Sequence, residues 1–97
     1  MTTLHIVRQS AFNSNDFAQC LQVIANDDVI TFIDDGCYNL QHKLTQHIDS
    51  NKNIKLTVIK HHAQARAITV DEALFTAISM DDLVMLTFDN DRVITWQ

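Results

Sequence analysis

The feature that most restricts the fold of this chain is the lack of proline and the presence of a single glycine among its 97 residues. All-β sandwiches contain many tight turns that usually require both residue types, so this composition argues against that class. Turns must instead be formed by Asn and Asp, whose side chains hydrogen-bond to the nearby backbone. We expect turns at the clusters of these residues at 13–16, 26–28, 34–36, 49–53 and 89–91.

Four short apolar runs are typical of buried strands. The clearest is 29–33, Val-Ile-Thr-Phe-Ile, a β-branched run expected of a strand covered on both faces. Similar runs are found at 4–7, 54–59 and 74–78. Longer segments separate them, which predicts alternating strands and helices with right-handed crossovers. The expected fold class is therefore α/β, a three-layer sandwich with a mainly parallel sheet, formed by one domain over residues 1–97.

Two of the intervening segments show the apolar spacing of helices. The first helix should begin after an N-cap at Ser14 or Asn15. Its apolar positions are Phe17, Leu21, Ile24 and Ala25. The second helix should follow Gly36. Its apolar stripe contains Cys37, Leu40, Leu44 and Ile48.

A third helix is expected over residues 81–88, with Ser79 as its N-cap. Asp81 and Asp82 then lie in the first turn, where the helix dipole favours acidic side chains. A shorter helical stretch is predicted at 63–67. Capping and turn formation explain this acidic pair and the pair Asp34-Asp35, so neither is assigned a catalytic role.

In parallel α/β sheets, functional groups usually gather in the crevice outside the carboxyl ends of the strands. This rule selects three segments, at 8–15, 34–38 and 60–66, because each follows one of the first three strands. We expect the candidate functional residues to lie there.

Charge and composition restrict the partners and the compartment. Seven basic and twelve acidic residues give a net charge of -5, which repels nucleic acid, so direct binding of nucleic acid is not expected. Two cysteines without an apolar signal segment predict a reduced, cytoplasmic protein. The apolar runs are far shorter than the roughly 20 residues that cross a bilayer, so no membrane association is expected.

The two cysteines are the candidate nucleophiles. Cys37 follows Asp34-Asp35-Gly36 at a strand-to-helix junction, where a helix N-terminus lowers a thiol pKa and the two carboxylates oppose that effect. Its place on the apolar stripe favours packing as a small hydrophobe. Cys20 lies beside Phe17 in the first helix, and its spacing also favours packing. The alternative is that Cys20, at the edge of the apolar stripe of the first helix, exposes its thiol to solvent or to a partner.

The five histidines raise the question of a metal site, but their spacing does not support one. His42 and His47 are five positions apart and do not share a helix face. The adjacent His61 and His62 fit a loop after the third strand better than a ligand pair. One glycine also excludes a Gly-rich phosphate loop. We therefore expect no metal and no cofactor.

Trp96 lies in the tail 92–97, where a free end would usually fray unless something held it. A last strand packed against its own domain is one explanation. An aromatic contact in a subunit interface, where tryptophan is enriched, is the other. The sequence leaves both open.

Several short motifs follow one another along nearly the whole chain. Leu4-His5 precedes Ser10-Ala11-Phe12, Asp35-Gly36-Cys37-Tyr38 follows the second strand, and Trp96 lies at the end. In order and spacing these motifs resemble the TusB/DsrH family of small sulfur-relay subunits. The chain departs from the family at Ala11, which replaces the usual proline, and at Ala67, where an Arg-Gly pair is common and the backbone geometry should therefore differ.

The resemblance implies a DsrE-like fold and assembly with two sister subunits, TusC/DsrF-like and TusD/DsrE-like, into a heterohexamer that relays persulfide sulfur. In the Tus branch the sulfur proceeds towards 2-thiouridine at the tRNA wobble position, and in the Dsr branch it serves dissimilatory sulfur oxidation. The principal active cysteine belongs to the TusD/DsrE-type sister. This chain is therefore expected to be a non-catalytic or auxiliary subunit of a sulfurtransferase complex.

The resemblance also assigns roles to individual residues. Cys20 matches a cysteine of DsrH-type members and becomes the candidate persulfide carrier, whereas Cys37 replaces an apolar family residue. Phe12, Tyr38 and Trp96 are the candidate interface residues. Two other hypotheses remain, a purely structural interaction module and an independent thiol enzyme that uses Cys37.

Overall fold

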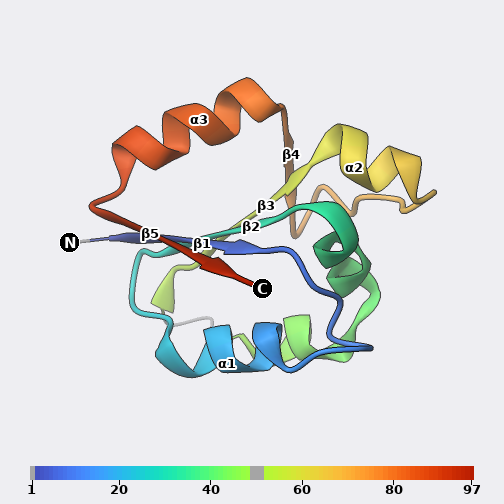
Figure 1. The fold of residues 1–97 in the computed structure, drawn as a ribbon, viewed down its shortest axis with the longest axis horizontal. Coiled ribbons are helices and arrows are strands. Elements are labelled where there is room, and N and C mark those ends of the chain that lie inside the picture. Colours follow the sequence, from blue (N-terminus) through green and yellow to red (C-terminus); the bar gives the residue numbers. More distant parts are fainter. Residues whose placement is uncertain (1, 49–51) are drawn as a thin grey trace.

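A computed structural model describes residues 2–48 and 52–97 and shows one five-stranded sheet between helical layers (Figure 1). The strands are β1 (Thr3–Val7), β2 (Val29–Phe32), β3 (Lys55–Ile59), β4 (Thr76–Ile78) and β5 (Arg92–Trp96). Their order across the sheet is β4-β3-β2-β1-β5, and every neighbouring pair is parallel. The predicted α/β class with a mainly parallel sheet is confirmed.

The central strand β2 shows why these runs form strands. All four of its residues are buried, because β1 and β3 flank it and helices cover its two faces. A β-branched and aromatic sequence suits such an environment. The predicted run at 74–78 was too long, since β4 begins at Thr76. Leu74 instead lies in a turn, where its backbone N–H donates to the carbonyl of Asp71 and its side chain is exposed.

The helical segments are α1 (Asp16–Val23), the 3-10 helices η1 (Asp34–Gln41) and η2 (Lys43–His47), α2 (Lys60–Ala65) and α3 (Met80–Asp89). From β1 to β4 the chain moves across the sheet in one direction, so right-handed crossovers place α1, η1, η2 and α2 on one face. The reversal from β4 to β5 places α3 on the other face. Figure 1 shows α1 and α3 on opposite sides of the sheet.

Each face of the sheet has its own apolar core. On the α1 side, Phe17 and Cys20 pack with Ile30 and Phe32, and the rings of Phe17 and Phe32 meet edge to face at 5.2 Å between centroids. On the α3 side, the core consists of Leu4, Val29, Ile59 and Leu83. Burial of these side chains supplies the main driving force for folding.

The predicted second helix is wrong as one continuous element. It is divided into η1 and η2 at His42, whose backbone is extended with φ -92° and ψ 140°. The ring nitrogen Nδ1 of His42 accepts the backbone N–H of Leu44, and this local bond competes with helix continuation. The apolar stripe still packs inward, since Cys37 is buried and Leu40 and Leu44 pack against the same core.

The starts of the other helices follow the prediction more closely. Ser79 and Asp82 form a capping box at the start of α3, in which each side chain accepts the other residue's backbone N–H. The helix α1 follows Asn15, whose side chain makes no capping bond, while Ser14 Oγ accepts the N–H of Asp16.

The turns are formed by Asn and Asp, as predicted from the lack of proline and glycine. Asp27, Asp34 and Asn53 adopt positive φ values of 68°, 50° and 59°, a conformation that Asn and Asp tolerate better than most residues. Of the predicted turn cluster at 49–53, residues 49–51 lie outside the part of the chain that the structure describes.

The segment after β3 differs from the expected loop. The helix α2 begins at Lys60, directly after the strand, so His61 and His62 are helical. The helix ends in a Schellman motif, in which the N–H groups of Ala67 and Ile68 donate to the carbonyls of Gln64 and Ala63. Ala67 has a φ of 55°, the conformation that glycine usually adopts at this position. The alanine at position 67 therefore adopts the left-handed conformation that the Schellman motif requires, and a difference from the family's backbone at this position stays a prediction.

Candidate functional site at the carboxyl edge of the sheet

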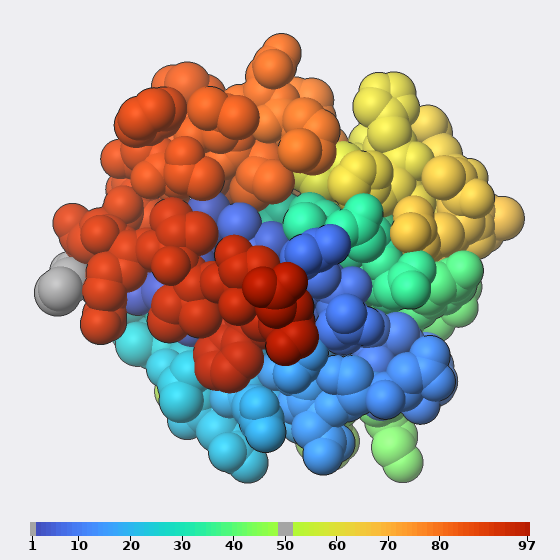
Figure 2. All heavy atoms as spheres, viewed as in Figure 1, coloured from blue at the N-terminus to red at the C-terminus, as the bar shows by residue number. Residues whose placement is uncertain are grey.

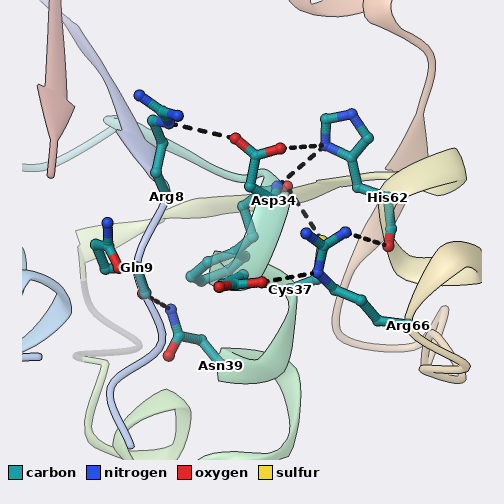
Figure 3. Close-up of polar contacts among 9 residues, drawn as sticks. Arg8, Gln9, Asp34, Cys37, Asn39, His62 and Arg66 are labelled. Carbon is teal, nitrogen blue, oxygen red and sulfur yellow. Dashed lines mark hydrogen bonds and ion pairs between the residues drawn. The ribbon is translucent and has the colours of Figure 1, made fainter. Parts of the chain in front are cut away.

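The carboxyl ends of β1, β2 and β3 bring the three selected segments together (Figure 3). Arg8 follows β1, and Asp34 and Asp35 follow β2. His62 lies in α2, and Arg66 comes directly after this helix. Polar contacts connect side chains from all three segments. The prediction that these segments gather at one edge of the sheet is confirmed.

Asp34 connects the three segments. Its carboxylate Oδ2 lies 3.3 Å from Nε of Arg8, and its backbone N–H donates to Nδ1 of His62 over 3.0 Å. The same Nδ1 lies 3.7 Å from the Asp34 Oδ1. A ring nitrogen that accepts an N–H presents its lone pair and carries no proton, so this second contact is not an ion pair. His62 is therefore held as the tautomer with its proton on Nε2.

Arg66 joins the neighbouring carboxylate to the same cluster. Its Nε lies 3.0 Å from Oδ1 of Asp35, and its Nη1 donates to the carbonyl of His62 over 3.2 Å. The assignment of Asp34-Asp35 to capping is therefore wrong in part. Asp34 does form a turn, but neither side chain caps η1, and both carboxylates pair with arginines. These pairs are solvent-exposed, so they fix side-chain positions more than they stabilise the fold.

Gly36 and Asn39 fasten η1 to the segment that follows β1. The N–H of Gly36 donates to the carbonyl of Arg8 over 2.9 Å. Asn39 is fully buried; its Nδ2 donates to the carbonyl of Gln9, and its Oδ1 accepts the N–H of Ala11 at 2.7 Å. Sequence reasoning missed Asn39 because its partners lie 28 and 30 positions away.

Cys37 lies beneath this cluster and is fully buried. Its Sγ lies 3.9 Å from the carbonyl oxygen of Phe32. Burial raises the pKa of the Cys37 thiol to about 11; Arg66 opposes this change, and Asp34 and Asp35 add to it. The predicted packing role and the predicted effect of the two carboxylates are both confirmed.

Cys20 is also fully buried, on the inner side of α1. Burial raises the pKa of its thiol to about 12, and the negative charge of Asp28 contributes in the same direction. The structure therefore places Cys20 among packed core residues, 0% exposed, and not at the surface. Its role as a persulfide carrier stays a prediction.

A second polar network joins the partly buried Trp96 to the buried residues His5 and Asp28. The indole Nε1–H of Trp96 donates to Nδ1 of His5 over 3.1 Å, and His5 Nε2 lies 2.9 Å from Oδ2 of Asp28. Because an indole only donates, His5 Nδ1 must accept, and its proton lies on Nε2, facing the carboxylate. The explanation of Trp96 as part of a last strand packed against its own domain is confirmed, since β5 pairs with β1.

Asp28 accepts two further hydrogen bonds from the backbone. The N–H of Thr3 donates to Oδ1, and the N–H of Ala25 donates to Oδ2, each over 3.0 Å. Burial alone would raise the pKa of Asp28, but the bonds from Ala25, His5 and Thr3 outweigh it and hold the pKa below its ordinary value of 3.8. The ionised carboxylate is therefore a structural element of the fold.

The three candidate interface residues lie near the carboxyl edge of the sheet. Phe12 is 61% exposed on the segment after β1, and its ring meets that of His42 at 4.6 Å between centroids. Tyr38 is partly exposed on η1, and Trp96 is partly buried at the end of β5. Participation of these residues in an interface stays a prediction.

Among residues 2–48 and 52–97, no three His, Cys, Asp or Glu side chains gather in a way that could hold a metal ion. None of the helices that the structure describes is long and apolar enough to cross a bilayer.

These observations define a small α/β domain with an all-parallel sheet, whose carboxyl edge joins arginine–carboxylate pairs above a buried thiol. The family model described as "DsrH like protein" matches residues 9–93. The chain therefore belongs to the DsrH-like family, and the resemblance found in its motifs is confirmed.

A solved structure with a similar fold supports this assignment of the architecture. The crystal structure of the ychN protein from E. coli superposes with a TM-score of 0.76, covering 99% of this chain and 100% of that chain at 17% sequence identity. At this identity the likeness shows the fold alone. No curated protein sequence gave a significant match.

Proposed function

We propose that this chain is the TusB/DsrH-type subunit of a cytoplasmic relay that passes persulfide sulfur towards 2-thiouridine at the tRNA wobble position. The observation that carries this proposal is membership of the DsrH-like family over residues 9–93. The chain would assemble with TusC/DsrF-like and TusD/DsrE-like sister subunits into a heterohexamer. The net charge of -5 fits contact with proteins better than direct contact with tRNA.

Burial of both thiols supports a structural role within that complex. Sulfur transfer requires a thiolate that can reach the donor persulfide. Cys20 and Cys37 are both 0% exposed, and their pKa values are raised to about 12 and about 11. A sister subunit would therefore supply the reacting cysteine, and this chain would supply surfaces that hold the complex together.

The alternative role for Cys20 is that of an auxiliary carrier. Its thiolate would attack the outer sulfur of a donor persulfide, forming a new S–S bond while the donor's S–S bond breaks and the donor cysteine leaves as a thiolate. The products are a Cys20 persulfide and a reduced donor, with no net oxidation. This step requires α1 to move away from the sheet, because Cys20 and Phe17 pack together beneath it.

Co-purification tests the proposed complex. We expect the tagged chain, expressed from its native locus, to elute with two small sister subunits in stoichiometric amount. We also expect deletion of its gene to remove 2-thiouridine from tRNA, as measured by mass spectrometry of digested nucleosides. Elution of the chain alone or as a homo-oligomer would contradict the complex. Unchanged 2-thiouridine with loss of sulfur oxidation would instead support the dissimilatory branch.

A further inference from the structure

The outer face of α3 carries four exposed apolar side chains. Met80, Val84, Met85 and Phe88 are 48%, 51%, 58% and 79% exposed. A surface helix usually places mainly polar residues on the side that faces away from the core, whereas these four apolar residues lie on that side of α3. Its inner side is already occupied, because Leu83 packs into the core beneath it. We call the four exposed residues the α3 outer face.

Topology explains why this face lies at the surface. Of the helices in the described residues, only α3 covers its side of the sheet, since the others follow right-handed crossovers on the opposite side. Figure 2 shows the α3 segment, in orange, at the outside of the molecule. Apolar side chains gathered on the surface of a small domain can mark an interaction site.

Acidic residues border the α3 outer face. Residues 79–91 contain four aspartates and no Lys, Arg or His. Asp81 lies three and four positions before Val84 and Met85, and Asp89 lies four positions after Met85, so both carboxylates share this side of the helix. The surface is therefore apolar at its centre and negative at its ends.

We propose that the α3 outer face is the docking surface for a partner protein whose own contact surface is apolar and bordered by Lys or Arg. Electrostatic complementarity favours such a partner. A second copy of this chain fits poorly, because a symmetric contact would bring the same carboxylates together. The inference rests on the proposed function, since it assigns the surface through which the chain joins its sister subunits.

Phe88 is the residue expected to contribute most to docking. Aromatic and methionine side chains are enriched at interface cores, and buried aromatic residues dominate binding. The substitution Phe88→Glu should leave the fold intact because the side chain is 79% exposed. Val23→Glu is the matched control, since Val23 is 57% exposed on α1, on the opposite side of the sheet.

The experiment measures binding of the full chain to the purified pair of sister subunits by titration calorimetry. We expect Phe88→Glu to weaken binding about 30-fold or more. Val23→Glu should stay within about twofold, as near-neutral surface substitutions do. The double substitution Asp81→Lys with Asp89→Lys should raise the dissociation constant and make it less dependent on salt concentration.

Each outcome separates this inference from the proposed function. If the unmodified chain and Phe88→Glu bind the sister subunits equally, the inference is wrong and the proposed function stands. A failure of the unmodified chain to bind them overturns the proposed function and the inference with it. If sedimentation shows that the chain alone forms a homodimer that Phe88→Glu dissociates, the occupant is a second copy and the inference is overturned.

Discussion

Replacing Gly36 with alanine is expected to lower the free energy of unfolding by about 3 kcal/mol or more, at the upper end of overpacking costs. A Cβ at this position would lie 2.1 Å from the carbonyl oxygen and 2.9 Å from the carbonyl carbon of Val7. Both atoms belong to the backbone of β1, which pairs with β2 and β5 and therefore cannot move aside locally. Separation of η1 from β1 would also displace the polar cluster at the carboxyl edge of the sheet, in which Asp34 contacts Arg8 and His62.

Urea denaturation and thermal denaturation, each followed by circular dichroism, measure this effect. Gln41→Ala, at an exposed position at the end of η1, is the control. The melting temperature of Gly36→Ala should fall by about 12 °C or more, while the control stays close to the unmodified chain. Equal stability of the two variants would show that β1 and η1 do not approach each other this closely.

Replacing Asp28 with asparagine is expected to cost about 2–4 kcal/mol, because charged acceptors are lost and a buried donor is left unpaired. Oδ2 accepts from His5 and Ala25, and Oδ1 accepts from Thr3. Whichever way the amide of the new side chain is turned, its NH₂ group meets at least one N–H donor. The substitution therefore weakens the connection between β1 and the loop that precedes β2.

Asp27→Asn is the matched control, because it removes the same charge from an exposed neighbour whose φ of 68° asparagine tolerates. The pH dependence gives a second measurement. The pKa of Asp28 is lowered in the fold, so its contribution to stability is present above 3.8 and is lost as the pH falls through the lower folded value. The unmodified chain should lose this contribution in acid, and Asp28→Asn should lack it. Matching stabilities of the two asparagine variants at pH 7 would contradict the network.

Local sequence signals were sufficient for β1, β2 and β3, for most of the turns and for the capping of α3. β-branched runs predict buried strands, and Asn and Asp clusters predict turns, because these preferences act over a few residues. The pattern of alternation then gives the parallel sheet, and the parallel sheet places three chain segments at one edge. The sequence therefore predicted that the segments containing Arg8 and Asp34 lie close together, although it did not predict the contact between these two side chains.

The rest of the site depends on partners that are distant in sequence. In the sequence Asp28 resembles an ordinary turn residue, and Asn39 resembles a polar position of the predicted second helix. Only their buried contacts with His5 and Gln9 show what they hold together. The break between η1 and η2 comes from the His42 side chain, whose bond to the backbone interrupts an otherwise suitable helical stripe. Ala67 shows the same limit, since the Schellman motif imposes a glycine-like backbone on an alanine.

The central claim is that this chain holds a sulfur-relay complex together without using its own thiols. The most direct test is the rate of persulfide transfer by the reconstituted three-subunit complex, with this chain unmodified, omitted, or carrying Cys20→Ala and Cys37→Ala together. The account predicts that omission abolishes transfer, whereas the cysteine-free chain, once shown to assemble, supports a rate within about twofold of the unmodified one. Loss of transfer by an assembled complex that contains the cysteine-free chain would contradict the account and would assign a carrier role to one of these thiols.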